Sequence, residues 1–341
     1  MAVVAMKSPG QHMTVEIAEV PGVFVRSARQ AVPIAPTEAG FGNARAIYTI
    51  ARGSSDAAAL ILAYEFMARL RVPVTSLPPS VFSIGPGVDL TNAHALVISQ
   101  SGASDDLVRS VTGARARGAK TFAITNVAGS NVEASADVTV SIGAGPEQAV
   151  PATKTVVGSI AAGMALLAAI DPDYGAERDR AVRVFEGLAA DAALPEGPKL
   201  ASALLRAQHV YVIGRGTGFG AAQEVALKLK ETCALHAEAY SASEVLHGPL
   251  QLVSKQLTVL ILDTGEPAMQ PSLDEADARF CAAGASVFRV RSTDMGVDRM
   301  TPAGAAAMLL YALYPVVLSA ALSLGYDPDT PANLAKVTRT A

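Results

Sequence analysis

The chain has 341 residues, of which half are hydrophobic and only 17% are charged, and its formal net charge at pH 7 is −4. This length suffices for two domains with full cores, and the apolar composition excludes a disordered chain. The acidic balance argues against a nucleic-acid-binding surface, which requires a basic face. Cys233 and Cys281 form neither a disulfide framework nor a zinc-ligand spacing. We therefore expect a cytoplasmic globular protein that binds no nucleic acid and no metal.

The first half of the chain predicts an α/β domain. Residues 1–42 are expected to form an arm with a short helix around residues 15–19. Apolar runs then alternate with amphipathic segments, which is typical of a parallel sheet covered by helices on both faces. The predicted strands are 46–51, 72–75, 93–99, 121–125 and 138–142, and the predicted helices are 57–70, 104–117 and 155–170. We place this domain at residues 43–172, followed by a polar connector rich in proline.

The second half repeats the first half at an offset of 163 residues. Residues 210–217 align with residues 47–54, residues 259–265 align with residues 96–102, and, after a three-residue insertion, residues 284–290 align with residues 118–124. Three strand–turn units that match in the same order indicate a duplicated α/β domain. We therefore predict a second domain at residues 199–326 and a C-terminal tail at residues 327–341.

One segment, residues 300–326, contains no charged residue and is long enough to cross a bilayer. Pro315 lies in its middle, and no cationic cluster flanks the segment to set an orientation. We therefore predict no membrane span. Instead, we expect a helix buried between the second sheet and a partner subunit, and hence a homodimer.

Hydroxyl side chains gather at two turns that follow strands of the first domain. The polar residues of these turns are Ser54, Ser55, Ser99, Gln100, Ser101 and Ser104. Open α/β sheets bind ligands at the carboxyl ends of their strands, and the helix that follows each turn favours phosphate at its N-terminus. Serines that only cap these helices are the alternative for either turn alone. No nucleotide-binding signature accompanies the turns, so the expected ligand is a small phosphate ester.

The second copy differs at the equivalent turn, where Asp263 and Thr264 replace Gln100 and Ser101. The carboxylate of Asp263 would repel an anion. The sequence therefore predicts that phosphate binds only to the first copy.

Residues 224–250 concentrate charged and imidazole side chains in a chain that otherwise has few. Glu224, Lys228 and Glu231 recur at spacings of four and three, which places them on one side of a predicted helix. His247 follows in a His-Gly-Pro turn. A carboxylate, an amine and an imidazole in one cleft can move protons near pH 7. An ordinary solvated face laced by ion pairs is the alternative.

Several motifs resemble those of the tandem sugar isomerase (SIS) domain family, and the resemblance covers nearly the whole chain. The motifs are RGSSDAA at 52–58, ISQSGAS at 98–104, AVPATK at 149–154, the stretch 214–250, and PANLAK at 331–336. The resemblance implies two flavodoxin-like, three-layer domains, as in the isomerase half of glucosamine-6-phosphate synthase. It is strongest toward the SIS-type glucosamine-6-phosphate deaminases.

The resemblance also implies roles for individual residues. The implied sugar-phosphate site consists of Ser54, Ser55, Ser99, Gln100, Ser101, Ser104 and Val150. Glu231 would move a proton between C1 and C2, His247 of a neighbouring subunit would open the sugar ring, and Lys336 would bind or orient the sugar. Lys228 and Glu224 match further active-site positions. No cofactor is implied.

The activity that the resemblance implies is conversion of glucosamine 6-phosphate to fructose 6-phosphate and ammonia. The synthase begins with a glutaminase domain whose nucleophilic cysteine follows the initiator Met, whereas residue 2 here is Ala, so we expect the deaminase direction. A glutaminase-less synthase-like isomerase and a deglycase of amino-acid adducts stay open as alternatives. A non-catalytic sugar-phosphate sensor would lack the acid/base residues. Gluco- and galacto-configured substrates fit the motifs equally.

Overall fold

Five parallel strands form the sheet of the first domain, in the order β2-β1-β3-β4-β5. They are β1 (Ala46–Ile50), β2 (Val74–Ser76), β3 (Ala93–Ser99), β4 (Lys120–Thr125) and β5 (Val138–Ser141). The central strand β3 is buried along its whole length, which explains its continuous apolar sequence. Because the strand order reverses between β1 and β3, a crevice is expected at the carboxyl ends of these two strands.

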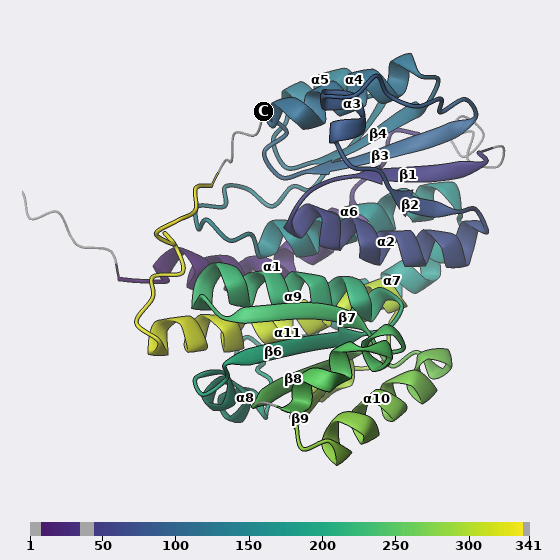
Figure 1. Cartoon of the computed structure of the whole chain (residues 1–341). Coiled ribbons are helices and arrows are strands. Elements are labelled where there is room, and N and C mark those ends of the chain that lie inside the picture. The colour runs from purple at the N-terminus through teal and green to yellow at the C-terminus, as the bar shows by residue number, and fades with distance from the viewer. Residues whose placement is uncertain (1–7, 35–43, 255, 337–341) are drawn as a thin grey trace, which may run out of the picture.

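The computed structural model describes residues 8–34, 44–254 and 256–336. Helices cover the first sheet, and the strands with their helices confirm the predicted α/β class (Figure 1). The helices of the first domain are α2 (Ser54–Leu70), α3 (Ser80–Ser83), α4 (Asp105–Ala116), α5 (Asn131–Ser135) and α6 (Lys154–Ile170).

The second sheet has four parallel strands in the order β7-β6-β8-β9. They are β6 (His209–Gly214), β7 (His236–Ser241), β8 (Leu257–Asp263) and β9 (Ser286–Arg291). In this order β6 and β8 occupy the places that β1 and β3 have in the first sheet, in agreement with the sequence alignment. The helices around the second sheet are α8 (Gly197–Leu204), α9 (Thr217–Cys233), α10 (Gln270–Ala282) and α11 (Pro302–Ser323), with 3-10 turns η2 (Glu244–His247), η3 (Pro249–Ser254), η4 (Pro267–Met269) and η5 (Ser292–Met295).

The N-terminal helix is longer than the predicted short helix and is part of the core. Helix α1 spans Gln11–Arg29 and packs against α6 and against α7 (Tyr174–Glu186), a helix inside the connector that the sequence did not predict. Buried Met13, Val20 and Phe24 lie on one side of α1, and Phe24 stacks on Phe185 with ring centroids 3.8 Å apart. Because Pro21 lies inside the helix, the sequence did not indicate one continuous amphipathic helix here. The rest of the predicted arm, residues 1–7 and 35–42, lies outside the described residues.

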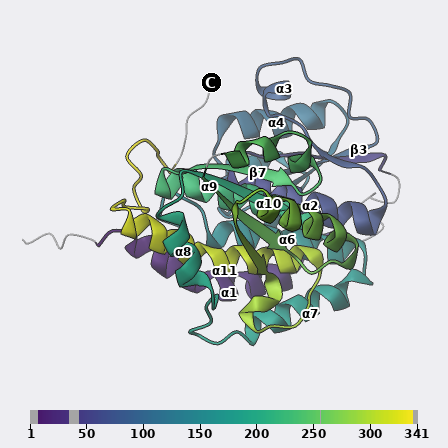
Figure 2. The same ribbon diagram turned by 60° about the horizontal axis from the view of Figure 1, so that its bottom comes forward.

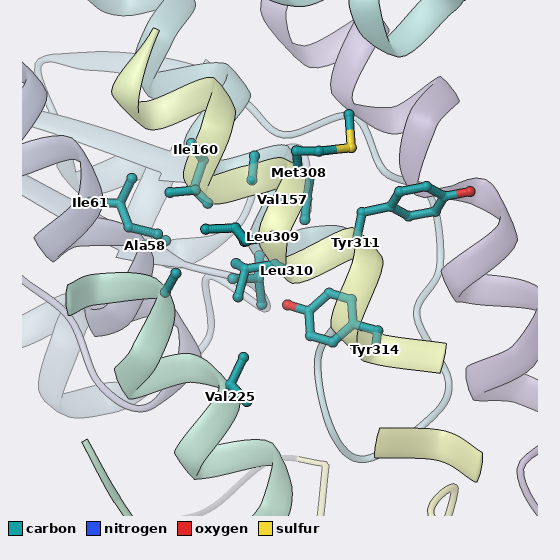
Figure 3. Packing of buried hydrophobic residues seen from close by; sticks show 14 of the residues in the cluster. Ala58, Ile61, Val157, Ile160, Val225, Met308, Leu309, Leu310, Tyr311 and Tyr314 are labelled. Atoms are coloured by element: carbon teal, nitrogen blue, oxygen red, sulfur yellow. The ribbon is translucent and has the colours of Figure 1, made fainter. Parts of the chain in front are cut away.

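Helix α11 corrects the predicted subunit contact. It is buried inside the chain itself, where it packs against α9, α8 and α6 and runs beside α1 (Figures 1 and 2). Figure 3 shows Leu309 and Leu310 of α11 between side chains of α2, α6 and α9. By length and composition α11 is one helix that could cross a membrane, but 83% of its most apolar stretch is buried, as in a core helix. Contacts within the chain therefore bury this uncharged helix, and no contact with a partner subunit is needed to shield it from water.

A close contact between α2 and α9 joins the two domains. A Cβ atom added at Gly220 of α9 would lie only 2.6 Å from Ile61 Cγ1 and 3.0 Å from the carbonyl oxygen of Ala57. Glycine at this position therefore allows the two helices to approach closely. As a result, α9 of the second domain faces the first turn of α2, where β1 ends.

Candidate functional site

A cavity of about 350 Å³ lies at the carboxyl ends of β1 and β3, opposite α9. Its position matches the crevice that the reversal of strand order predicts. The lining comes from the two serine turns, from residues near Val150, from α9 and from the C-terminal segment. The residues are Arg52, Gly53, Ser54, Ser55, Ile98, Ser99, Gln100, Ser101, Ser104, Leu107, Val150, Ala152, Lys228, Glu231, Leu334, Ala335 and Lys336.

The serine turns leave two helix N-termini without side-chain caps. Gly53 precedes α2 and Ser104 precedes α4, and neither residue makes a side-chain cap hydrogen bond in the described structure. Ser99 Oγ accepts a hydrogen bond from the N–H of Gly102 at 3.1 Å, which shapes the second turn. The N-capping alternative is therefore wrong for Ser104. In α2 the N–H groups of Ser55 and Asp56 donate to the carbonyl oxygens of Arg52 and Gly53 at 3.2 and 3.0 Å, so the turn hydroxyls and the dipoles of the two helices are the features that favour an anion here.

The charged face of α9 is buried rather than solvated. The side chains of Glu224 and Lys228 are 0% and 1% exposed, while Glu231 is partly exposed and lines the cavity. Lys228 Nζ lies 3.6 Å from Glu224 Oε1 and also forms an ion pair with Glu231. Tyr314 of α11 donates a hydrogen bond to Glu224 Oε1 at 3.3 Å. This burial excludes the alternative of an ordinary surface ion-pair network.

The two buried members of this cluster, Glu224 and Lys228, both have raised pKa values. Burial raises the pKa of Glu224 to about 7, although the positive charge of Lys228 opposes the rise. Burial lowers the pKa of Lys228, but the charges of Glu224 and Glu231 outweigh that effect and raise the pKa overall. Lys228 therefore remains an ammonium beside the Glu231 carboxylate. A carboxylate held by a buried cation at the wall of a cavity is suited to proton transfer.

The C-terminal segment reaches the cavity because two carboxylates hold it. Asp329 accepts hydrogen bonds from the N–H groups of His12 and Met13, both at 2.8 Å, at the start of α1. Lys336 Nζ donates to Glu147 Oε2 at 3.2 Å and to the carbonyl oxygen of Ala149 at 2.6 Å. These contacts fix Lys336 at the cavity wall.

Glu147 is a residue of the site that the sequence reasoning missed. Its side chain is fully buried, and it accepts hydrogen bonds from the N–H groups of Thr153 and Thr155 at 3.0 and 3.1 Å and from the Thr155 hydroxyl at 2.6 Å. One signal was present in the sequence. Glu147 is the lone charged residue between Asp137 and Lys154, and a single carboxylate in an uncharged stretch needs a partner.

Arg52 was missed as well. It lines the cavity and pairs with Asp106 of α4 at 3.0 Å. The ion pair connects the first turn of the site to the helix that follows the second turn.

His247 does not line this cavity. It is exposed at the end of η2 and lines a separate cavity with Leu246, Gly248 and Leu250 among other residues. Of the predicted site residues, the serine turns, Val150, Lys228, Glu231 and Lys336 thus share one cavity. Glu224 lies behind Lys228, and a single chain does not bring His247 to them.

Comparison with known sequences gives a family match. The family model described as SIS domain matches residues 41–169 and 203–270. A glutamine–fructose-6-phosphate aminotransferase [isomerizing] of Aeropyrum pernix is 37% identical over 289 residues, which cover 77% of this chain and 46% of the relative. The chain therefore spans about half the length of this relative.

Comparison with solved structures agrees with this match. A candidate phosphosugar isomerase from Silicibacter pomeroyi superposes with a TM-score of 0.82 at 33% identity, covering 93% of this chain and 99% of the other. The C-terminal domain of glucosamine-fructose-6-phosphate aminotransferase from Francisella tularensis gives 0.81 at 22% identity, covering 97% and 100%. A glucosamine-6-phosphate deaminase from Thermotoga maritima gives 0.74 at 21% identity, also covering 97% and 100%. The last two likenesses concern the fold alone.

The prediction that phosphate binds only to the first copy can be tested with substitutions that each remove one hydroxyl group. Ser55→Ala or Ser101→Ala should weaken binding of fructose 6-phosphate about tenfold to hundredfold, because a hydrogen bond to a charged group contributes about 1.5–3 kcal/mol. In the second copy, Thr264→Ala, which matches Ser101→Ala, and Thr217→Ala, at the position equivalent to the neighbouring Ser54, should leave the affinity within about twofold of the wild type. Titration calorimetry measures all four. Equal losses in both halves would contradict a phosphate site confined to the first copy.

Proposed function

Because this chain belongs to the SIS domain family, we propose that it converts glucosamine 6-phosphate and water to fructose 6-phosphate and ammonia. The observation that carries this proposal is the single cavity in which two phosphate-suited turns face Glu231 and Lys228. A sugar phosphate anchored at the turns would extend toward α9. The A. pernix relative, whose name includes fructose 6-phosphate, supports this substrate class.

The phosphate group would bind at the serine turns and Val150. Hydroxyls of Ser54, Ser55, Ser101 and Ser104 can donate to its oxygens, and the N-terminal dipoles of α2 and α4 favour its negative charge. Lys228 is the buried cation on the opposite wall. This arrangement would hold the sugar with its C1 and C2 atoms toward Glu231, so that binding the phosphate positions the reacting carbons.

Glu231 would act as the base of the reaction. In the ring-opened substrate it would take the proton from C2 and return it to C1, while a proton of the C2 amino group moves to the C1 oxygen, so that the C1 aldehyde becomes a hydroxymethyl group and the C2 amine becomes a C2 imine. Water would then add to the imine, and ammonia would leave as C2 becomes a ketone. The Lys228 ammonium and Glu224 would hold the Glu231 carboxylate in place before the first transfer and after the second, when it is ionised.

Lys336 supports the deaminase direction over the synthase direction. A lysine that forms an imine with a ketose needs a free, neutral amine. Here Lys336 Nζ already donates hydrogen bonds to Glu147 and to the carbonyl oxygen of Ala149. A substrate that carries its own amine needs no such imine. Lys336 would therefore close over the sugar without a covalent bond to it.

The synthase direction is the second candidate function. The 37% identity to a relative named as an aminotransferase favours it. A deglycase of amino-acid adducts would need a cavity with room and charge for the amino acid. A sensor without activity accounts less well for a base and two lysines at one cavity.

The partners follow from the same proposal. We propose a cytoplasmic homodimer in which the cavity of each chain is completed by His247 of its partner, which would protonate the ring oxygen. Exposure of His247 on a turn next to Leu252, whose residue surface is 51% exposed, supports a contact surface there.

An ammonia-release assay tests the proposed reaction. The wild type should release ammonia from glucosamine 6-phosphate, and Glu231→Gln should lower kcat by about 10²–10⁴-fold, the range for a lost acid/base group. Glu275→Gln, which removes an exposed carboxylate of α10, is the matched control and should keep full activity. Galactosamine 6-phosphate and fructoselysine 6-phosphate, assayed in parallel, define the substrate. Release of free lysine from fructoselysine 6-phosphate, measured by amino-acid analysis, without ammonia release from glucosamine 6-phosphate would favour the deglycase.

The reverse assay separates the two candidate functions. Net formation of glucosamine 6-phosphate from fructose 6-phosphate and ammonium, together with borohydride trapping of the ketose on Lys336, would contradict the deaminase proposal.

Mixing inactive variants tests the shared site. Glu231→Gln and His247→Ala chains, exchanged into heterodimers, should recover a substantial part of the activity because each heterodimer contains one intact cavity. Absence of recovery after verified subunit exchange would place both residues in the site of one chain.

A further inference from the structure

The second copy keeps the backbone of the phosphate turns. Gly216 precedes α9 with φ 58° and ψ −131°, and Gly53 precedes α2 with φ 56° and ψ −132°. This left-handed region of φ favours glycine, so both copies specify the same unusual turn. The second turn is also retained, because Gly265 and Gly102 both have positive φ. The fold therefore builds a second cradle at the ends of β6 and β8.

A carboxylate of the chain occupies this second cradle. Glu266 Oε1 accepts a hydrogen bond from the Thr264 hydroxyl at 3.3 Å and lies 3.4 Å from the Thr217 hydroxyl, whose single proton is shared between this oxygen and the Pro302 carbonyl oxygen at 3.1 Å. The same oxygen lies 3.3 Å from the position that a Cβ on Gly216 would take. Thr217 and Thr264 align with Ser54 and Ser101 at the offset of 163 residues. Glu266 thus contacts the groups whose counterparts are suited to phosphate in the first copy.

The cavity beside Glu266 has the opposite charge character to the first one. It measures about 300 Å³, and no Lys, Arg or His occurs among the described residues that line it. At the position equivalent to Lys228 it has Glu65, whose carboxylate accepts hydrogen bonds from the Tyr174 hydroxyl at 2.8 Å and from the Ala303 N–H at 3.1 Å. A cation of the first site is therefore replaced by a buried carboxyl group.

Asp263 is not the residue that keeps an anion out of the second copy, contrary to the expectation from sequence. Arg289 donates to its Oδ2 at 3.1 and 2.8 Å, and Gln270 and the Gly265 N–H donate to its Oδ1, each at 2.8 Å. Burial acts to raise the pKa of Asp263, but these bonds outweigh burial and lower it. Its charge is balanced within the second domain, so the anion that enters the cradle is Glu266.

We propose that Glu266 is a built-in anion that fills the phosphate cradle of the second copy and keeps phosphate esters out of it. The cradle is then a latent site for a phosphate monoester, in which Glu266 occupies the turns and Glu65 stands where the first site has a cation. Each chain consequently binds one sugar phosphate, in the cavity that contains Glu231, and substrate is not held where no base is present. This inference rests on the proposed function for the identity of the first ligand.

Counting bound fructose 6-phosphate tests the inference. Equilibrium dialysis of the full chain with radiolabelled fructose 6-phosphate at about pH 8, where carboxyl groups with moderately raised pKa values are ionised, gives the number of sites. The wild type should bind one ligand per chain and Glu266→Ala two, with kcat unchanged because Glu266 does not touch the first cavity. Glu275→Ala removes an exposed carboxylate from the same domain and should still bind one.

Each outcome decides between the alternatives. One site in Glu266→Ala and also in Glu266→Ser, a smaller change that keeps a hydroxyl in the cradle, would overturn the inference, as would two sites in the wild type. Absence of binding to the wild type would contradict the proposed function, and a site gained in the variant would still support the role of Glu266. Absence of binding to every variant would overturn both.

Discussion

The buried cation of Lys228 is the interaction on which the site depends. Removing an ammonium from water costs several kcal/mol unless charged partners compensate, and here Glu224 and Glu231 lie on the same helix face as partners. Glu224 in turn accepts a hydrogen bond from Tyr314 of α11. The cluster therefore ties α9 to the core helix and leaves Glu231 as the member that reaches the cavity. Loss of either carboxylate would leave a poorly compensated charge in the interior.

The contact between α2 and α9 converts this cluster into a site. The first domain supplies the two serine turns, and the second domain supplies the charged helix, so neither domain contains the cavity alone. The two sheets have corresponding strand orders, and both α2 and α9 begin after the same glycine turn. A cavity lies at each of these turns, and the two cavities differ in charge, with Lys228 in one and Glu65 and Glu266 in the other.

The sequence predicted the parts of the structure that depend on local pattern. Buried parallel strands such as β3 have continuous apolar runs, and the spacing of Glu224, Lys228 and Glu231 identified one helix face. Edge strand β7 was not predicted, because polar residues interrupt its sequence and leave no continuous apolar run. Contacts between segments that are far apart in the sequence were not predicted either. The bond from Lys336 to Glu147 joins residues 189 positions apart, and no local pattern encodes it.

Composition alone did not show what covers an apolar helix. The uncharged segment of α11 was expected to need a partner subunit, yet helices of the same chain bury it. Within one chain His247 lines a different cavity from Glu231, although both belong to the stretch 224–250, because β7 lies between them. The expectation that His247 serves the site of a neighbouring subunit stays a prediction.

The central claim is that Glu231 moves the C2 proton of a sugar phosphate. Incubating glucosamine 6-phosphate with enzyme in D₂O, and following the C2 hydrogen of the substrate and the C1 hydrogens of the product by proton NMR, tests it directly. The account predicts that the wild type and Glu275→Gln wash the C2 hydrogen out into solvent or move it to C1, and that Glu231→Gln leaves it in place. Loss of the C2 hydrogen at a comparable rate in Glu231→Gln would contradict the assignment.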